Sequence, residues 1–447
     1  MVKMFSKLRV TNECLGDETN QESWVLDLNS YRLDSVCDFI NGGAWSDTEY
    51  APSGIHVVKV TNLSDGRIIR RDDNYLPLSK FEEYKQHELR SGDIVVSTVG
   101  SHPTQPGSVV GRVALVSAEF SGSFLNQNAA CIRVIKPNLV SQRYLFYLAN
   151  TVLFKHHIES RARGSANQVR MAIGELKKFE VQYPSATEQK KVAAILSAYD
   201  ELIENNQRRI ALLEKMAEEI YREWFVRLRF PGYEKVKIVK EVPEGWQRKG
   251  LSSLGTYLNG YAFEPSDWGF EGIPIIKIKE MTGRVTAETP RNSGENIPGK
   301  YHFDDDAVIF SWSATLLVLI WDQGPGLLNQ HLFKVDPIPE VPKSFLYFSI
   351  KFSIPIFESL TTGATMQHIK RKELEVVKVN LPPVNLLNQF NALVSPMVKQ
   401  KLALTRANRN LIQTRDLLLP RLISGKLCVE NLDIQFPPSM EEPVHET

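Results

Sequence analysis

Two stretches of the chain gather side chains that could bind a polyanion. In the first, basic, hydroxyl and amide residues surround a glycine turn: Arg161, Arg163, Ser165, Asn167, Gln168 and Arg170. The second contains Thr365, Gln367, His368, Lys370 and Arg371. Lys and Arg neutralise phosphates, whereas Asn, Gln and Arg can recognise bases by paired hydrogen bonds worth about 1–3 kcal/mol. Both stretches are therefore candidate DNA contacts, and a solubilising surface loop is the alternative for each.

Two amide-rich turns are further candidates. The first contains Asn126, Gln127 and Asn128, and the second follows Asn329 with Gln330 and His331. Their amides could form hydrogen bonds with base edges. Buried amides that cap a turn explain the same residues equally well, so the sequence leaves both interpretations open.

No catalytic motif accompanies these residues. The chain lacks a GxxxxGK[ST] phosphate loop, an Asn/Asp-Pro-Pro-aromatic sequence of the amino-methyltransferase kind and a glycine-rich nucleotide loop after a strand. His156 and His157 have no acidic or Cys partner at metal-ligand spacing, so we expect a surface helix there. The acidic run 304–306 is expected to be a solvated loop. The sequence therefore predicts a binding protein with no catalytic residue, metal or cofactor of its own.

Composition narrows the class of protein. A chain of 447 residues is too long for one ordinary core, so two or more domains are expected. The net charge of +1 selects no partner, because a large nucleic-acid binder can keep its positive charge local. The four cysteines are far apart and form no CxxC pair, which argues against a zinc or redox site and favours a reducing cytoplasm. The longest apolar run, 307–321, is too short to span a bilayer and is predicted to form two buried strands with a bend.

The chain contains a diverged internal repeat. Residues 33–60 align with residues 251–278 without a gap, and Asn41, for example, falls on Asn259. Later matches recur in the same order: Leu125-Asn-Gln127 with Leu328-Asn-Gln330, and Gly164-Ser-Ala-Asn-Gln168 with Gly363-Ala-Thr-Met-Gln367. Several matches in one order indicate duplication. Polar residues that the repeat pairs are added to the candidate DNA contacts: Lys59 with Lys277, and Ser97 with Ser311.

Each copy begins with short apolar runs, such as 55–60 and 94–97, which are separated by turn-forming residues. This pattern is typical of strands and turns. Segments 142–161 and 343–358 have a helical pattern instead. Each copy is therefore predicted to be α+β, with a β-rich domain.

A long helix is predicted after each β-rich domain. Ser185 and Glu188 have the spacing of a capping box, and from there apolar residues recur at alternating four- and three-residue steps. The first seam comprises Val192, Leu196, Tyr199, Ile203, Asn206, Ile210, Leu213, Ala217, Ile220 and Trp224. The second comprises Phe390, Val394, Met397, Lys401, Leu404, Asn408, Leu411, Arg415, Leu418 and Leu422. Pro396 and Pro420 are expected to kink or end the second helix.

Two seams at matching positions favour helices that pack on each other, although a core helix of its own domain would be preferred for either one alone. We predict that the two helices run antiparallel, with Asn206 and Asn408 near each other. A paired rod of this size, about 50 Å long, would hold the two β-rich domains at a fixed distance. The first helix carries many acids and the second is basic, which fits either electrostatic pairing of the helices or a face for a partner.

Taken in order, these features resemble the specificity (S) subunits of type I restriction–modification systems, over residues 27–427. The resemblance rests on the two-fold repeat, on Pro243-Glu-Gly-Trp246 at the opening of the second unit, and on the Gly-x-x-x-Gln turns at Gly164 and Gly363. Segments 381–383 and 417–426 around the second helix belong to the same pattern. The first unit departs from it, because only Trp24 could stand in for the opening Trp and residues 1–22 have no counterpart.

The resemblance implies two target-recognition domains that read two different halves of a split, asymmetric DNA site. It also implies that the paired helices set the spacer and dock two adenine methyltransferase subunits, which bind S-adenosylmethionine and flip an adenine out of the duplex. A separate restriction and motor subunit would use ATP and Mg²⁺. The implied domains are an N-terminal extension (1–26), recognition domain 1 (27–184), helix 1 (185–230), a linker (231–242), recognition domain 2 (243–384), helix 2 (385–427) and a C-terminal tail (428–447).

Two other classes of function remain open from the residues alone. One is a non-catalytic scaffold whose two β-rich domains bind peptide or glycan ligands, and salt-sensitive binding to duplex DNA would distinguish it. The other is a self-contained enzyme, against which the absent motifs argue.

Overall fold

The computed structural model describes residues 29–101, 108–165, 168–361, 369, 371–437 and 440. The chain divides into two compact units, residues 1–201 with 412–447, and residues 202–411. Each unit contains one β-rich domain and part of both long helices, α7 (Ala186–Tyr221) and α11 (Val384–Ile423). The prediction of a duplicated α+β chain with a long helix after each β-rich domain is therefore confirmed in outline.

The first β-rich domain is built on a six-stranded sheet with the order β2-β11-β7-β9-β5-β4. Its strands are β2 (Cys37–Asn41), β4 (Leu63–Ser64), β5 (Gly66–Ile68), β7 (Ile94–Ser97), β9 (Val113–Leu115) and β11 (Ala129–Val134). A second sheet contains β10 (Phe124–Leu125), β3 (Ile55–Val58) and β6 (Asn74–Leu76), and a third contains β12 (Arg163–Ser165), β13 (Gln168–Arg170) and β8 (Val99–Gly100). Strands β1 (Asn29–Arg32) and β14 (Glu180–Tyr183) close the domain as an antiparallel pair.

Helices α4 (Gln142–Ala149) and α5 (Val152–Arg161) cover the large sheet of the first unit. Ser141 begins α4 as its N-cap, because its side chain accepts the amide N–H of Tyr144. The core joins strand residues such as Ile94 and Ile132 to α4 and to Leu196 of α7. The shorter helices of this unit are α2 (Leu33–Val36), α3 (Phe81–Tyr84) and α6 (Ile173–Leu176). The helical pattern predicted for 142–161 is thus confirmed, with a break at 150–151.

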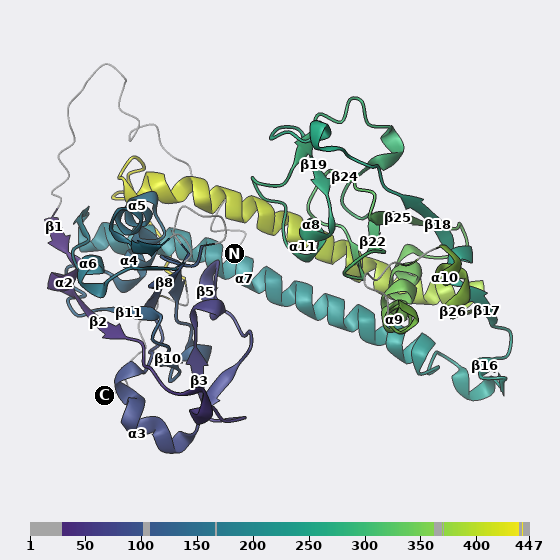
Figure 1. Cartoon of the computed structure of the whole chain (residues 1–447), viewed down its shortest axis with the longest axis horizontal. Coiled ribbons are helices and arrows are strands. Elements are labelled where there is room, and N and C mark those ends of the chain that lie inside the picture. Colours follow the sequence, from purple (N-terminus) through teal and green to yellow (C-terminus); the bar gives the residue numbers. More distant parts are fainter. Residues whose placement is uncertain are drawn as a thin grey trace. The chain divides into compact units, whose positions relative to one another are not determined.

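The second β-rich domain has two four-stranded sheets. One has the order β18-β25-β22-β23, and Figure 1 shows β18, β25 and β22 side by side. Its strands are β18 (Gly255–Asn259), β22 (Val308–Ser311), β23 (Leu317–Ile320) and β25 (Leu332–Pro337). The other sheet contains β19 (Ile273–Ile276), β20 (Arg291–Asn292), β21 (His302–Phe303) and β24 (Gly326–Leu328). The apolar run 307–321 forms β22 and β23, as predicted.

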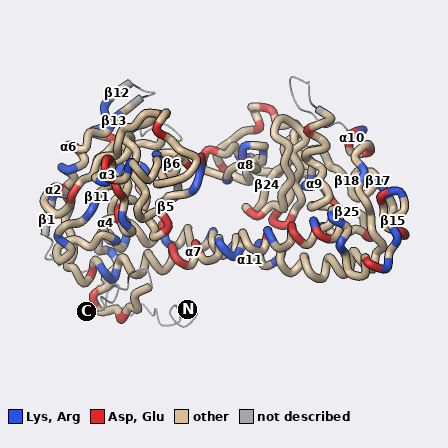
Figure 2. Tube along the Cα trace, turned by 90° about the horizontal axis from the view of Figure 1, so that it is seen from below, with Lys and Arg blue, Asp and Glu red and all other residues tan. Residues whose placement is uncertain are grey.

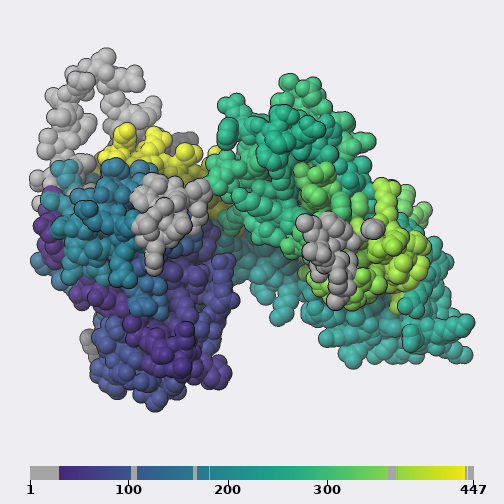
Figure 3. Space-filling model, viewed as in Figure 1, coloured from purple at the N-terminus to yellow at the C-terminus, as the bar shows by residue number. Residues whose placement is uncertain are grey.

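Two antiparallel pairs complete the strands of this unit: β15 (Ile238–Val239) with β16 (Val242–Pro243), and β17 (Gln247–Gly250) with β26 (Lys378–Leu381). Its helices are α8 (Ile278–Thr282), α9 (Lys343–Thr361) and α10 (Arg371–Val376). Side chains of α9 such as Phe345 and Phe357 are fully buried against the sheet. The space-filling view shows the atoms of this domain, in shades of green, on the face presented (Figure 3).

Strand pairing confirms the internal repeat residue by residue. Val57 pairs with Phe124 in the first unit, and Ile275 pairs with Leu327 in the second, both in parallel. The outer pairs agree as well: β1 with β14 and β17 with β26 have the same antiparallel register, and so do β2 with β11 and β18 with β25. The aligned sequences therefore fold into the same framework twice.

The long helices begin and end close to the predicted positions. The capping box at the start of α7 is confirmed, because the Ser185 amide N–H donates to the Glu188 carboxylate over 3.0 Å and the Glu188 N–H donates to the Ser185 hydroxyl over 3.3 Å. Helix α7 has 36 residues and continues into a π-helical turn, Arg222–Val226. Helix α11 has 40 residues.

One part of the expectation for the second helix is wrong. The helix does not end at Pro396 or Pro420, because α11 is continuous from Val384 to Ile423, and a kink at either proline stays a prediction. Each proline removes one backbone hydrogen bond, and apolar packing on both sides, from Val394 to Leu422, keeps the helix together across the gaps.

Contacts between α7 and α11 run in opposite order along the two helices. In the second unit Asn206 contacts Asn408, and Glu214 contacts Lys401. Trp224, in the π-helical turn that continues α7, contacts Phe390. In the first unit Asp200 contacts Arg415. Every predicted seam residue is buried or half-buried. The predicted proximity of Asn206 and Asn408 is confirmed.

The expectation of a solvated loop at 304–306 is wrong for its central residue. The Asp305 side chain is only 4% exposed and forms ion pairs with Arg406 and Arg409 of α11. Asp304, by contrast, is exposed. Within the described residues no helix combines the length and apolarity needed to cross a membrane.

Candidate nucleic-acid interface

Each unit holds a lysine over an aromatic ring at the same position of the repeat. The ammonium nitrogen of Lys59 lies 4.5 Å from the ring centroid of Tyr50, and that of Lys277 lies 3.8 Å from the ring centroid of Trp268. A cation is attracted by the electron-rich face of such a ring. Both candidate lysines are therefore positioned in the same way, at the end of strands β3 and β19.

The backbone of both lysines is fixed by a buried polar side chain three residues later. The Lys59 N–H donates to the Asn62 amide oxygen over 2.8 Å, and the Lys277 N–H donates to the Glu280 carboxylate over 3.0 Å. Asn62 and Glu280 are each 1% exposed. Burial lowers the pKa of Lys277, and the charge of Glu280 opposes this effect. The repeat thus conserves the geometry of the site while the capping residue changes from an amide to an acid.

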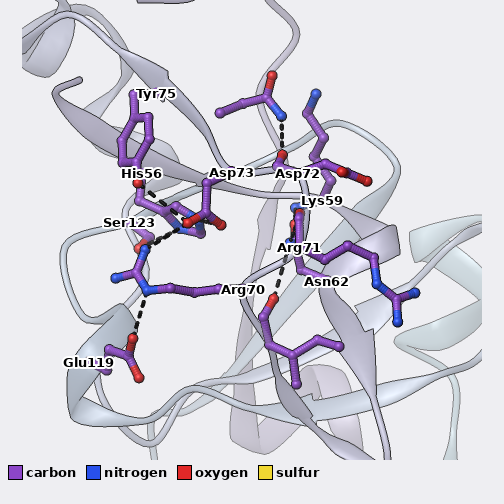
Figure 4. A network of polar contacts seen from close by, with 12 residues as sticks. His56, Lys59, Asn62, Arg70, Arg71, Asp72, Asp73, Tyr75, Glu119 and Ser123 are labelled. Carbon is purple, nitrogen blue, oxygen red and sulfur yellow. Dashed lines mark hydrogen bonds and ion pairs between the residues drawn. The ribbon is translucent and has the colours of Figure 1, made fainter. Parts of the chain in front are cut away.

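A polar network holds the loop beside Lys59 (Figure 4). Asp73 accepts hydrogen bonds from Arg70 over 3.1 Å and Tyr75 over 3.4 Å, and its carboxylate lies 3.1 Å from His56 Nε2. Arg70 also donates to Glu119 over 2.8 Å. Desolvation opposes ionisation of Asp73, but the bonds from Arg70 and His56 lower its pKa. The carboxylate is therefore kept charged, and the loop that follows β5 is tied to the domain.

Asn62 connects this loop to the lysine. Its amide nitrogen donates to the carbonyl oxygens of Ile69 over 3.1 Å and Arg71 over 2.8 Å, while its oxygen accepts from the Lys59 N–H. The Arg71 side chain is exposed. One buried amide therefore holds the backbone of two cationic residues, Lys59 and Arg71, next to each other (Figure 4).

The amide turns occupy equivalent places in the two units. Asn126 forms a bridge with Gly43, and Asn329 forms one with Tyr261. The preceding glycines allow the close approach: a Cβ at Gly42 would lie 1.8 Å from the Asn126 carbonyl oxygen, and one at Gly260 would lie 2.1 Å from that of Asn329. Only glycine fits at both positions, which explains why Gly42 and Gly260 recur.

In these two turns some side chains cap the turn and others are exposed to solvent. Asn329 is buried, and its amide oxygen accepts the His331 N–H over 3.5 Å, so the turn-capping interpretation holds for this residue. Gln127 and His331 are exposed, whereas Asn126, Asn128 and Gln330 are half-buried. Gln127 and His331 are therefore the residues of these turns that can reach a ligand most directly.

The prediction that Ser97 and Ser311 contact DNA is wrong. Both are 0% exposed, at the ends of β7 and β22. The Ser97 hydroxyl donates to the Val109 carbonyl oxygen and accepts the Arg112 N–H over 3.0 Å. The Ser311 hydroxyl donates to the Ser313 carbonyl oxygen over 3.1 Å. The Ser97 hydroxyl therefore holds the segment that precedes β9, and the Ser311 hydroxyl holds the turn that follows β22.

The first basic stretch forms a hairpin of β12 and β13 that is continued by β8. Arg163 pairs directly with Arg170 across the hairpin, and both side chains are exposed. Like charges opposite each other destabilise a strand pair, and an anion bound between them would remove the repulsion. Arg161 is half-buried, with Nη1 3.0 Å from the Ser160 hydroxyl and Nε 3.7 Å from the Glu175 carboxylate. Ser165 and Gln168 are described by their backbone only, and Asn167 lies outside the described residues.

We expected both histidines of α5 to lie on the surface, but only one of them does. His156 is exposed, but His157 is 8% exposed and its Nε2 lies 2.9 Å from the Glu175 carbonyl oxygen. Burial lowers the pKa of His157, the bond to Glu175 opposes this, and the charge of Arg161 lowers it further. In the described part of the chain no three or more His, Cys, Asp or Glu side chains are grouped so that they could hold a metal ion.

The structure describes only part of the second basic stretch. Thr365, Gln367, His368 and Lys370 lie outside the described residues, so their predicted contacts stay predictions. Arg371 begins α10 and is exposed.

Sequence reasoning missed several residues that the geometry brings together. Tyr50 and Trp268 were detectable, because they fall on each other in the same gapless alignment that pairs Lys59 with Lys277. Arg70 and Arg71 had no such signal, since the loop that contains them has no counterpart of equal length in the second unit. The repeat therefore identifies the shared framework of the site better than its individual parts.

Two copies of one α+β framework, each presenting a fixed lysine and an amide turn, are the features of a two-domain recognition protein. The family model described as the type I restriction modification DNA specificity domain matches residues 26–215 and 243–411. The chain therefore belongs to this family.

Relatives span most of the chain. The MjaIX type I restriction enzyme specificity subunit of Methanocaldococcus jannaschii is 29% identical over 322 residues, which are 69% of this chain and 74% of that protein. The putative MjaX specificity subunit of the same organism is 23% identical and covers 89% of this chain and 93% of its own length. The crystal structure of the type I restriction–modification S subunit from M. genitalium has a TM-score of 0.58 at 17% identity, over 94% of this chain and 99% of that one. This likeness shows a shared fold.

Proposed function

We propose that the chain is the DNA-specificity subunit of a type I restriction–modification complex, in which two recognition domains read two different halves of a split, asymmetric site. Family membership supports this proposal, and so do the names of the relatives. The observation that carries the two-part reading is the lysine held over an aromatic ring at one repeat position in each unit. A lysine so placed can neutralise a phosphate whatever the base sequence.

The surroundings of the two lysines differ, and this supports unlike half-sites. Asn62 in the first unit corresponds to Glu280 in the second, and Tyr50 corresponds to Trp268. Two identical domains related by symmetry would read two identical half-sites. One chain with diverged copies can read two different ones. A perfectly palindromic target would contradict this part of the proposal.

The two long helices, in this proposal, pack as an antiparallel coiled coil that sets the spacer between the half-sites and docks two methyltransferase subunits. The buried or half-buried seam residues and the Asn206–Asn408 contact support it. Four of the basic residues of α11 bind within their own unit: Lys401, Arg406, Arg409 and Arg415. The charge pattern therefore supports pairing of the helices and seating of a domain, and Figure 2 shows the charged positions along α7 and α11.

The chemistry is assigned to partner subunits. This chain would hold no cofactor and catalyse no step, whereas the methyltransferase subunits would bind S-adenosylmethionine, flip an adenine out of the duplex and methylate it. Restriction subunits would use ATP and Mg²⁺. A cytoplasmic location fits the four separated cysteines, and Cys37, Cys131 and Cys428 are free thiols.

The test is to map modified adenines in cells that express this chain with adenine methyltransferase subunits. We expect a bipartite site with two unlike halves. Replacement of residues 28–184 by another recognition domain should change one half only, and a change in both halves would refute the modular picture. The alternative, a scaffold for peptide or glycan ligands, predicts no salt-sensitive binding to duplex DNA by the assembled complex.

A further inference from the structure

A buried carboxylate of the second β-rich domain forms ion pairs with α11. Asp305 Oδ2 accepts hydrogen bonds from Arg406 Nε over 2.8 Å and from Arg409 Nη2 over 2.7 Å. Its Oδ1 accepts the Gly324 N–H over 2.6 Å. Asp305 precedes β22 and Gly324 follows β23, so the base of one hairpin holds two cations of the helix. Burial opposes ionisation, but Gly324 and the two arginines lower the pKa of Asp305.

A second contact lies one to two turns away on the same helix. Lys401 of α11 lies 3.5 Å from the Asp322 carboxylate of the domain and 2.8 Å from the Glu214 carboxylate of α7. The Lys401 side chain is only 16% exposed. The hairpin therefore contacts α11 at Lys401, Arg406 and Arg409, and through Lys401 it is linked to α7 as well. We call this set of contacts between the hairpin and α11 the second seat.

The first unit has a seat of different chemistry, centred on α7. Asp200 Oδ2 accepts the Tyr147 hydroxyl over 2.7 Å, and Oδ1 accepts Arg415 Nη1 over 2.6 Å. The Asp200 carbonyl oxygen accepts Arg67 Nη2 over 3.1 Å. Here the carboxylate belongs to the helix and the domain supplies Tyr147 from α4 and Arg67 from β5. One helix residue thus holds the domain and the other helix together.

We propose that the two seats fix the orientation of each recognition domain on its helices and thereby restrict the spacer length that the protein accepts; this inference rests on the proposed function. Each added base pair rotates one half-site relative to the other by about 35°. A domain held rigidly can follow such a change only by straining its seat. Asp305 is buried and Asp200 is half-buried. Charged hydrogen bonds to such carboxylates are short and directional, so they resist rotation more than apolar packing does. Asp305 and Asp200 are positioning residues in this account, and neither contacts DNA.

The experiment uses the full chain assembled with methyltransferase subunits, and duplexes that carry the mapped half-sites with the natural spacer or one base pair more or less. The spacer ratio of a variant is its binding or methylation rate on the duplex with the natural spacer, divided by its rate on a duplex with one base pair more or less. Asp305→Asn keeps the shape and the acceptor for Gly324 but removes the charge. We expect its preference for the natural spacer to fall by about tenfold, with both half-site sequences unchanged. The matched control is Asp304→Asn, at the exposed neighbouring carboxylate, which should behave like the wild type.

The first seat allows an equally close comparison. Tyr147→Phe removes only the hydroxyl that binds Asp200 and should lower the spacer ratio. Tyr144→Phe is its control, because the buried Tyr144 hydroxyl has no hydrogen-bond partner among the described residues. If Asp305→Asn does not fold, Arg406→Ala, which removes one of the two helix cations, decides the question for the second seat, with Lys399→Ala as its control.

An unchanged spacer ratio in folded Asp305→Asn and Tyr147→Phe would overturn the inference, and so would an equal loss in the control variants. A wild-type complex that does not prefer its mapped site over unrelated duplex would instead contradict the proposed function. The two failures are therefore distinguishable.

Discussion

The amide nitrogen of Asn206 on α7 donates a hydrogen bond to the amide oxygen of Asn408 on α11 over 2.8 Å. Asn206 and Asn408 are 5% and 6% exposed. The amide nitrogen of Asn408 donates to the Ile203 carbonyl oxygen over 3.3 Å. A buried amide pair in an apolar seam lowers stability relative to leucine, but it tolerates only the register in which the amides meet. This pair therefore selects one alignment of the two helices.

Replacing both residues with leucine should raise the melting temperature and loosen the register. Leucine side chains have a similar volume and need no hydrogen-bond partner, so the melting temperature rises. The register loosens because Asn206 and Asn408 are the only two amides among the predicted seam residues. Scanning calorimetry measures the first effect, and faster amide hydrogen exchange in α7 and α11 measures the second. Asn206→Leu alone is the control: it leaves the Asn408 amide oxygen unpaired and should lower stability by about 1–3 kcal/mol. A double variant that melts below the wild type would contradict the interpretation.

Removing either lysine that lies over an aromatic ring should weaken DNA binding in a sequence-independent way. Each phosphate contact contributes a slope of about −0.9 to the dependence of log K on log salt. We expect Lys59→Ala and Lys277→Ala each to reduce this slope by about that amount, with the methylated sequence unchanged. Titrations of the complex over a range of salt concentrations measure it. Lys235→Ala, at an exposed position of the linker, should leave the slope as it is.

The sequence predicted the framework well because the framework has periodic signals. Alternating apolar steps placed Asn206 and Asn408 on the seams of the two helices, and the gapless alignment placed Lys59 and Lys277 at equivalent positions of the two units. A hydrogen-bonded strand pair cannot change register without moving a whole row of side chains to the other face. The strand registers of the two units therefore agree wherever the alignment has no gap.

Individual side chains were predicted less well, since burial depends on contacts between distant segments. All four residues of β7 are buried, so the strand has no alternation of buried and exposed residues from which the burial of Ser97 could be predicted. In α5, Val152 and Leu153 are 79% and 58% exposed whereas His157 is 8% exposed, which reverses the expected pattern. The partners of the buried Asp305 side chain include two arginines about a hundred residues later, Arg406 and Arg409. No local rule connects these residues.

The opposed arginines of the β12–β13 hairpin give a prediction in which stability and binding change in opposite directions. Arg163→Gln removes the repulsion with Arg170 and should stabilise the first domain by about 0.2–1 kcal/mol. It should also weaken DNA binding, because one cation is lost. Arg163→Glu should stabilise at least as much, by forming an ion pair with Arg170, and weaken binding further. Thermal melting and DNA titration check both effects, and a destabilised Arg163→Gln would show that the repulsion is already compensated within the domain.

The buried His157 makes the stability of the first unit sensitive to pH. Because burial lowers its pKa in the folded state below the ordinary value of 6.5, the unfolded chain binds the proton more tightly. Stability from this residue is therefore complete above pH 6.5 and decreases as the pH falls from there through the lower folded-state pKa. His157→Gln should remove this part of the pH dependence, whereas His156→Gln, at the exposed neighbour, should keep the wild-type profile. Melting temperatures of the three proteins between pH 7.5 and about 5 test this, and parallel profiles for wild type and His157→Gln would mean that the imidazole titrates as if it were exposed.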